Sequence, residues 1–143
     1  GKPSKKQWTV NEPIGAHPNT NFRTKQAVVK NGQEAITIFK VLKEKPNYCL
    51  LEVKPKTGRT HQIRVHAAWS ELPLVGDKKY CKNEAIYLEY MEKGFTPLVK
   101  KHCISERLCL HAKSLEFDNP LNKAPLKIQT ALPDDMQEIW DRL

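Results

Sequence analysis

The densest run of polar side chains lies between residues 54 and 66 and reads KPKTGRTHQIRVH. Arg59 and Arg64 can each grip a phosphate or a carboxylate through two parallel hydrogen bonds. His61 and Gln62 can hydrogen-bond a base edge or a backbone group. The spacing matches no serine-hydrolase triad, phosphate-binding glycine loop or zinc-protease helix. Two interpretations therefore stay open: a site that binds an anion, or a basic helix cap whose arginines pair with nearby acids.

This polar run begins at the point where a predicted strand passes into a predicted helix. Residues 60–70 contain no proline or glycine, and Thr60 is a suitable N-cap, although a strand is the alternative. The first backbone N–H groups of a helix lack intrahelical partners and favour anions. In such a helix His61 and Arg64 share one face, whereas Ile63 lies on another. The pattern predicts a polar face for binding and an apolar face for packing.

The elements before the polar run are predicted to be strands. Residues 35–43 alternate and are rich in β-branched side chains, which is typical of a strand. Residues 48–54 predict a second strand, joined to the first by a short turn to form a hairpin. Residues 1–22 are rich in turn-forming residues and predict an irregular lead-in, so that residues 23–143 are expected to form the folded part.

The elements after the polar run alternate between helix and strand. Residues 84–93 predict a helix that ends at Gly94. Residues 107–117 predict a turn that leads into a strand, and residues 126–130 predict another strand. The clearest helix follows Pro133, because apolar residues repeat along one of its faces. The predicted class is α+β, with one domain or part of one.

Composition narrows the class of protein. The 143 residues carry a net charge of +8, and the mean hydropathy is −0.62. The longest apolar runs fall far short of the roughly 20 residues that a spanning helix needs, and no secretory signal is recognisable. A basic balance favours a polyanionic partner such as nucleic acid, although a solvated basic surface explains the charge equally well. We expect a cytoplasmic protein without a membrane partner.

The cysteines do not follow a disulfide or metal-binding pattern. A chain of this length does not need disulfide staples, so reduced thiols are the better interpretation. A zinc site is the alternative, and no C-x2-C pair supports it. Its candidate ligands would be Cys81, Cys103 and Cys109 with His102 or His111.

Three blocks together resemble a known family. Residues 57–66, followed by PLVGD at 73–77 and by Tyr80, are similar to the signature of the RluA-type RNA pseudouridine synthases. Residues 107–117 resemble the next block of that family, and the resemblance extends over residues 23–143. It implies a mixed, largely antiparallel sheet flanked by helices, of which this chain would be the C-terminal half.

The resemblance also implies a chemistry. In this family a buried aspartate acts on a uridine whose base detaches from the ribose, rotates and is rejoined through carbon, with no metal or organic cofactor. The target nucleotide is flipped out of the RNA. Arg64 is expected to pair with that aspartate and to contact RNA, and Ile63 to line the pocket. The remaining substrate-binding positions that the resemblance implies are Arg59, Thr60, His61 and Gln62.

One departure from the family pattern concerns activity. The family's aspartate lies in a string of the form H-R-L-D-x-x-T-S-G, which this sequence lacks, as it lacks the tyrosine that packs over the flipped base. Asp77 is a poor substitute, because an aspartate in a Gly-Asp turn usually bonds the local backbone. The chain alone is expected to be inactive and to depend on a missing N-terminal half.

The function predicted from the sequence is part of an enzyme that isomerises uridine in ribosomal or transfer RNA. The alternative is a non-catalytic RNA-binding module derived from such an enzyme. Without the missing half, exposed sheet edges and apolar surface predict self-association of the fragment.

Overall fold

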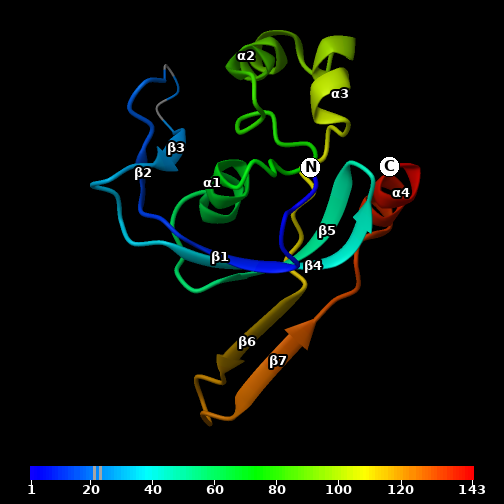
Figure 1. Cartoon of the computed structure of the whole chain (residues 1–143). Helices are drawn as coiled ribbons and strands as arrows, with labels where there is room; N and C mark the ends of the chain where they lie inside the picture. The colour runs from blue at the N-terminus through cyan, green and yellow to red at the C-terminus, as the bar shows by residue number, and fades with distance from the viewer. Residues whose placement is uncertain (21, 23) are drawn as a thin grey trace. The chain divides into compact units, whose positions relative to one another are not determined.

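The computed structural model describes residues 1–20, 22 and 24–143, which form two compact units, Gly1–Leu108 and Cys109–Leu143 (Figure 1). Each unit is described by itself. The predicted boundary at Arg23 lies outside the described residues, and the predicted division of the chain there stays a prediction. Between described residues, the strand pairings are all antiparallel, and the predicted α+β class is confirmed.

The main sheet of the first unit has three strands in the order β1-β4-β5. Strand β4 (Ile36–Lys45) and strand β5 (Tyr48–Pro55) form the predicted hairpin, which is therefore confirmed. Phe39 in the middle of β4 is fully buried, because Trp8 stacks on its ring and Val10 and Ala67 pack against it. The polar run of residues 54–66 begins at the end of β5 and continues into the helix that packs against this sheet.

The N-terminal segment contributes strands to this unit. Strand β1 (Gln7–Asn11) pairs with β4, and strand β2 (Ile14–Ala16) pairs with strand β3 (Gln26–Val28). The irregular structure predicted for residues 1–22 is therefore wrong over β1 and β2. Val10 is buried against Phe39, so tertiary packing outweighs the local turn-forming composition.

Helix α1 (Gln62–Trp69) carries the polar run and packs against the strands (Figure 1). Ala67 is buried with Val10 and Phe39, and Val65 is buried in a neighbouring cluster. The predicted helix over residues 60–70 is confirmed. Its N-cap is His61 and not Thr60, and His61 adopts a left-handed backbone with φ 57°.

Helices α2 (Glu84–Lys93) and α3 (Pro97–Cys103) form a small helical layer of their own. The prediction for residues 84–93 is confirmed, with Gly94 at the helix end at φ 73°. Helix α3 was absent from the predictions, although Thr96 caps it by accepting a hydrogen bond from the N–H of Val99. Its side chains Val99 and Cys103 pack with Ile86 of α2.

The second unit contains strand β6 (Ser114–Asp118), strand β7 (Pro125–Gln129) and helix α4 (Asp134–Arg142), in agreement with the predicted strands and closing helix. Strands β6 and β7 form an antiparallel hairpin in which Leu115 lies opposite Ile128. The side chains of both strands are exposed. The predicted self-association of the chain stays a prediction. Within the described residues, no helix is both long enough and apolar enough to cross a membrane.

Candidate functional site

The centre of the candidate site is an ion pair between Arg64 on α1 and Asp77 in the loop that follows. Arg64 donates from Nε to Oδ2 of Asp77 at 2.8 Å and from Nη2 to Oδ1 at 2.9 Å. The Asp77 side chain is completely buried, and 18% of the Arg64 side chain is exposed. Burial opposes the charge of Arg64, but the hydrogen bonds and negative charge of Asp77 raise its pKa above the ordinary value. Arg64 is therefore a fixed cation at the edge of the fold.

Asp77 also organises its own loop. Its Oδ1 accepts hydrogen bonds from the backbone N–H groups of Lys79 at 3.2 Å and Tyr80 at 3.1 Å. The prediction that Asp77 bonds local backbone is therefore confirmed. A carboxylate that is completely buried and accepts four hydrogen bonds is not presented to a substrate, so Asp77 acts by positioning its neighbours.

Within this chain, Arg64 has a partner that was not predicted. Arg64 was expected to pair with an aspartate outside this chain, whereas within the chain it pairs with Asp77. The pair uses Nε and Nη2, and Nη1 takes no part in it. A pairing of Arg64 with a second carboxylate, supplied from outside the chain, stays a prediction.

Tyr80 joins this ion pair to the helix N-terminus. The guanidinium carbon of Arg64 lies 4.8 Å from the centre of the Tyr80 ring, a distance that allows a cation–π interaction. The Tyr80 hydroxyl accepts a hydrogen bond from the backbone N–H of Gln26 at 3.0 Å and lies 2.8 Å from Nδ1 of His61. Burial raises the pKa of Tyr80, so its hydroxyl keeps its proton.

These contacts favour one tautomer of His61. Because the Tyr80 oxygen already accepts from Gln26, its own proton is best donated to Nδ1 of His61, and the imidazole proton then lies on Nε2. Burial, together with the positive charges of Arg64 and Lys79, lowers the pKa of His61. His61 is therefore a neutral imidazole that offers a hydrogen-bond donor at the start of α1.

The loop that carries Asp77 and Tyr80 is held tightly at its start. Gly76 has φ 78°, and a Cβ atom there would lie only 1.7 Å from the carbonyl oxygen of Arg107. The N–H of Gly76 donates to the carbonyl of Cys103 at 2.9 Å. Only glycine allows this close approach, which brings the loop against the segment that follows α3.

Lys78 holds the same loop from the side of the helical layer. Its ammonium group donates to the carbonyl oxygen of Glu106 and lies 4.8 Å from the ring centre of Tyr90 and 5.6 Å from that of Phe95. Only 9% of Lys78 is exposed. Asp77 and Tyr80 thus lie on a segment fixed on both sides, which keeps the Arg64 pair in place.

Gln62 connects the site to the sheet. Its side-chain oxygen accepts from the N–H of Arg59 at 3.0 Å and from the hydroxyl of Thr57 at 2.7 Å. Its amide nitrogen donates to the carbonyl of Ile36 and to the hydroxyl of Thr37. With only 4% of the residue exposed, Gln62 holds α1 on the strands, and this burial argues against the predicted contact of Gln62 with RNA.

His66 continues this network into the core. Its Nε2 lies 3.0 Å from the carbonyl oxygen of Glu12, which can only accept, so Nε2 carries the proton. Nδ1 then accepts from the Thr37 hydroxyl at 2.8 Å. Burial is the main cause that lowers the pKa of His66. His66 is therefore a structural, neutral histidine.

We expect the free energy of unfolding to decrease as the pH falls below about 6.5, the ordinary pKa of histidine. The unfolded chain accepts a proton on His66 at a higher pH than the folded chain does. The unfolded state therefore binds more protons in this range, and stability rises with pH. The lowered pKa of His61 adds to the same slope. Urea unfolding at several pH values between 5 and 8 measures this dependence of the free energy of unfolding on pH.

The control is His66→Gln, which retains a donor near the Nε2 position and cannot titrate. Its stability is expected to vary less with pH between 5 and 7 than that of the unaltered chain. An equal slope in both proteins would show that His66 does not carry the effect.

The remaining predicted site residues lie beside the pair. Arg59 and Thr60 are exposed and line a cleft of about 270 Å³, opposite Gly15 and Gln26 of strands β2 and β3. Arg59 also donates from Nε to the carbonyl of Glu34 at 2.9 Å, which limits its movement. These two side chains are available to a ligand in that cleft.

Ile63 is half-buried on α1, next to Arg64 in the sequence. Its predicted role in lining the uridine pocket stays a prediction.

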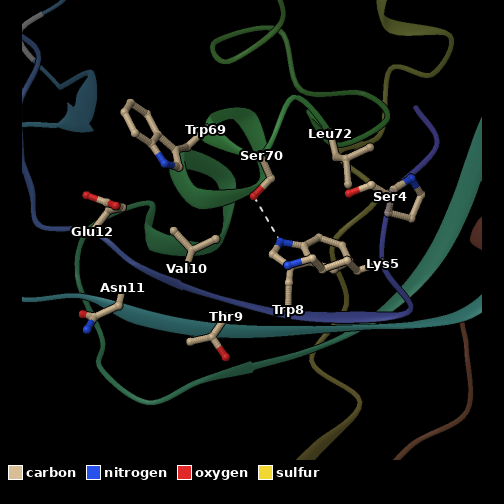
Figure 2. A pocket seen from close by; sticks show the side chains of 11 residues that line it. Ser4, Lys5, Trp8, Thr9, Val10, Asn11, Glu12, Trp69, Ser70 and Leu72 are labelled. Carbon is tan, nitrogen blue, oxygen red and sulfur yellow. Dashed lines mark hydrogen bonds between the residues drawn. The ribbon is translucent and has the colours of Figure 1, made fainter.

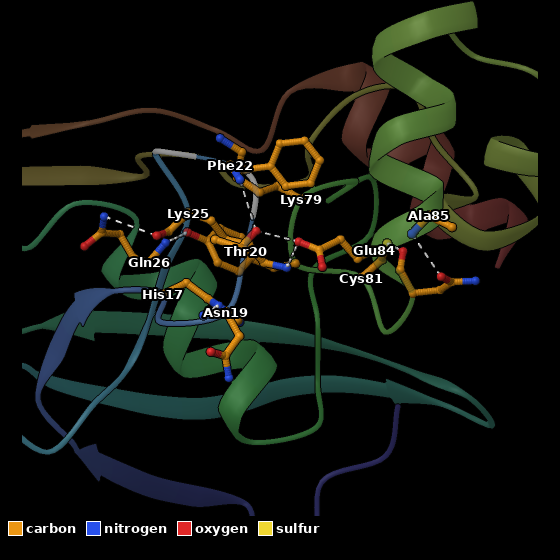
Figure 3. Close-up of polar contacts among 12 residues, drawn as sticks. His17, Asn19, Thr20, Phe22, Lys25, Gln26, Lys79, Cys81, Glu84 and Ala85 are labelled. Carbon is orange, nitrogen blue, oxygen red and sulfur yellow. Dashed lines mark hydrogen bonds and ion pairs between the residues drawn. The ribbon is translucent and has the colours of Figure 1, made fainter.

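A polar cluster fixes the loop before β3 to the start of α2 (Figure 3). The carboxylate of Glu84 accepts from the hydroxyl of Thr20 at 2.6 Å and from the ammonium of Lys25 at 3.1 Å. These two hydrogen bonds lower the pKa of Glu84. Lys79 reaches the same region, where its ammonium lies 5.2 Å from the ring centre of Tyr87. The cluster anchors the side of the site on which Tyr80 meets β3.

The cysteines do not form a metal centre with the histidines. The four cysteines all lie among the described residues and form no disulfide with one another, and Cys81 packs against the buried Cys103 in the helical layer. In the part of the chain that the structure describes, no three side chains of His, Cys, Asp or Glu gather as metal ligands.

Asp77 as the partner of Arg64, and Tyr80 as its neighbour, are the site residues that the predictions missed. The signal in the sequence is the step Gly76-Asp77 followed by Tyr80, because an aspartate in a turn can accept from the N–H groups two and three residues later. That spacing does not reveal the distant partner of the carboxylate.

Comparison with known proteins decides the family. Residues 2–69 match the family model described as RNA pseudouridylate synthase. The ribosomal large subunit pseudouridine synthase D of Xanthomonas campestris pv. campestris is 37% identical over 136 residues, which are 94% of this chain and 39% of that protein. The chain belongs to the RluA-type RNA pseudouridine synthases.

Other members of this family agree with the assignment. The uncharacterized RNA pseudouridine synthase YlyB of Bacillus subtilis is 33% identical over 94% of the chain and 38% of its own length. Human RNA Pseudouridylate Synthase Domain Containing 4 superposes with a TM-score of 0.69 and 26% identity, over 98% of this chain and 57% of that one. The chain therefore spans about two fifths of the length of these curated pseudouridine synthases and represents a partial domain.

Proposed function

We propose that this chain is the part of an RNA pseudouridine synthase that supplies the Arg64 side of the active site. The observation that carries the proposal is the buried, bidentate pair of Arg64 with Asp77, which fixes a permanent cation beside Tyr80 and His61. A cation held this way needs no reorganisation to meet a negatively charged group, which is the condition for electrostatic catalysis.

In this proposal the attacking carboxylate comes from a segment outside this chain. The C1′–N1 bond of the uridine breaks, the uracil turns, and a C1′–C5 bond forms; the proton at C5 is released and N1 takes up a proton. Arg64 holds the incoming carboxylate ionised through Nη1 and steers the backbone phosphate of the flipped nucleotide. Arg59, Thr60 and the neutral His61 offer hydrogen-bond donors to neighbouring RNA groups.

The proposed substrate is ribosomal RNA. The names of the pseudouridine synthase D relatives state the large ribosomal subunit, and a net charge of +8 suits a polyanion. A ribosomal RNA target also fits a cytoplasmic protein. A non-catalytic RNA-binding module is the alternative, because the Arg64–Asp77 pair forms without a second carboxylate.

The test uses the full-length protein that contains this chain and ribosomal RNA with tritium at C5 of uridine. Isomerisation releases the label into water. The variant Arg64→Met is expected to slow the release by roughly 100-fold or more, and Arg64→Lys by somewhat less, because lysine keeps the charge and loses the fork. Arg142→Met, which removes an exposed arginine of α4, is the matched control.

Release by Arg64→Met within about threefold of the unaltered protein would remove Arg64 from the mechanism. If the unaltered full-length protein binds ribosomal RNA but releases no label, the RNA-binding module becomes the better account.

A further inference from the structure

A pocket of about 390 Å³ lies between the N-terminal segment and the end of α1, away from the Arg64 pair (Figure 2). Two indole rings, Trp8 and Trp69, belong to its walls. Val10 and Leu72 add apolar surface, and the rest of the lining is largely polar. The other lining residues are Pro3, Ser4, Lys5, Thr9, Asn11, Glu12 and Ser70.

One of the two indoles is held in place before any ligand arrives. Trp8 stacks on Phe39 with ring centres 5.1 Å apart and an interplanar angle of 12°. Its Nε1 donates to the hydroxyl of Ser70 at 3.2 Å. An aromatic wall fixed by stacking and by a hydrogen bond loses little conformational freedom when it binds a flat ring.

The other indole is mostly exposed. Trp69 is the last residue of α1, and 56% of its surface is accessible. A single exposed apolar side chain is common on protein surfaces. Here the exposed indole lines the same pocket as the fixed indole of Trp8, and an exposed aromatic ring can stack on a nucleobase.

The polar lining distributes charge along the pocket. Figure 2 shows Lys5 and Ser4 at one end and Glu12 at the other. Lys5 is exposed, and its ammonium suits a phosphate. The carboxylate of Glu12 can accept hydrogen bonds from the exocyclic or ring N–H groups of a base. This polarity matches a nucleotide, which carries its charge at one end and its base at the other.

We propose that this pocket binds one nucleotide of single-stranded RNA, with the base stacked on the indole of Trp69 and the phosphate at Lys5. The proposal rests on the proposed RNA substrate and adds a second contact to it. Trp69 lies at the opposite end of α1 from His61, about 12 Å along the helix axis at 1.5 Å per residue. The bound nucleotide therefore belongs to the strand that flanks the target uridine.

The test is titration of this 143-residue chain with a uridine hexamer and with the same ribose-phosphate backbone lacking bases. Tryptophan quenching and fluorescence anisotropy of a labelled hexamer report binding. Trp69→Ala is expected to weaken hexamer binding by roughly 5- to 150-fold, the contribution of one stacked base. Trp69→Phe should keep most of the affinity, and Met91→Ala, which removes another exposed apolar side chain, should keep all of it.

A second variant tests the phosphate end. Lys5→Ala should reduce the slope of log affinity against log salt concentration by about 0.7, the value for one contact on a single strand. The backbone without bases should bind Trp69→Ala and the unaltered chain equally. Equal hexamer binding by Trp69→Ala and the unaltered chain, with both folded by circular dichroism, would overturn the proposal, as would equal affinity for the hexamer and the abasic backbone.

These outcomes are independent of catalysis. If the full-length protein releases no tritium but hexamer binding depends on Trp69, the proposed enzyme function fails and the nucleotide site stands. If tritium is released and Trp69→Ala binds normally, the nucleotide site fails and the enzyme function stands.

Discussion

Replacement of Asp77 by asparagine is expected to lower the free energy of unfolding by about 3 to 5 kcal/mol, the usual cost of removing one partner of a buried ion pair. The asparagine oxygen can take over the contacts of Oδ1. Its NH₂ group then faces Nε of Arg64, where Oδ2 lies now, so that two donors oppose each other. The charge of Arg64 also loses its counter-ion in a site where only 18% of the side chain is exposed. Urea unfolding of the chain measures the loss.

Asp118→Asn is the matched control, because Asp118 is an exposed aspartate at the end of β6. It should change stability by no more than about 0.5 kcal/mol. The double variant Arg64→Met with Asp77→Asn should cost less than the sum of the two single variants, because the second change removes a charge that the first has stranded. Additive costs, or a cost of Asp77→Asn equal to that of Asp118→Asn, would contradict a coupled pair.

The parts of the fold that could be predicted are those with a strong local signal. The hairpin of β4 and β5 follows from alternation and a Pro-Asn turn, and α2 is bounded by an Asn cap and by Gly94. In each case the signal lies within a few residues of the feature. Arg64 and His61 could be named as site residues because the motif at residues 57–66 resembles the family signature.

The parts that could not be predicted depend on distant partners. Strand β1 is a strand because β4 offers it a ladder and because Val10 finds Phe39, neither of which shows in a turn-rich segment. Helix α3 has only seven residues, too short for a periodic pattern to distinguish it from a turn, although Thr96 and Pro97 mark its start. Local composition is a poor predictor of secondary structure in segments that are stabilised mainly by tertiary packing.

In the candidate site, too, the features that could not be predicted depend on partners that are distant in the sequence. The family resemblance implies that Gln62 contacts RNA, whereas in the structure its side-chain amide hydrogen-bonds Thr57, Arg59 and strand β4. Asp77 looks like an ordinary turn residue until the turn is brought against Arg64. Spacing reveals which side chains can do chemistry, whereas burial decides which of them hold the others in place.

Gly76→Ala is expected to lower the free energy of unfolding by about 2 to 5 kcal/mol. Part of this cost is a positive φ of 78° for a residue with a side chain, about 1–2 kcal/mol. The rest is overpacking, about 1–3 kcal/mol, because the new methyl group would lie 1.7 Å from the carbonyl oxygen of Arg107 unless the loop moves. That movement shifts Asp77, the next residue, so the variant should also loosen the pair with Arg64. Thermal unfolding, together with hydrogen exchange of the Tyr80 N–H, measures both effects.

Gly58→Ala separates this explanation from a general effect of replacing glycine. Gly58 lies in the motif itself, yet a Cβ atom there meets no other heavy atom within 4 Å. Its replacement should change stability by no more than about 0.5 kcal/mol and leave the Tyr80 N–H protected, because that proton is held by Asp77. Equal losses in both alanine variants would show that backbone freedom, and not the contact with Arg107, sets the cost at Gly76. A loss confined to Gly76→Ala, with faster exchange at Tyr80, would show that the left-handed backbone of Gly76 and its close approach to Arg107 together hold the Asp77 loop, and with it the cation of the candidate active site, in position.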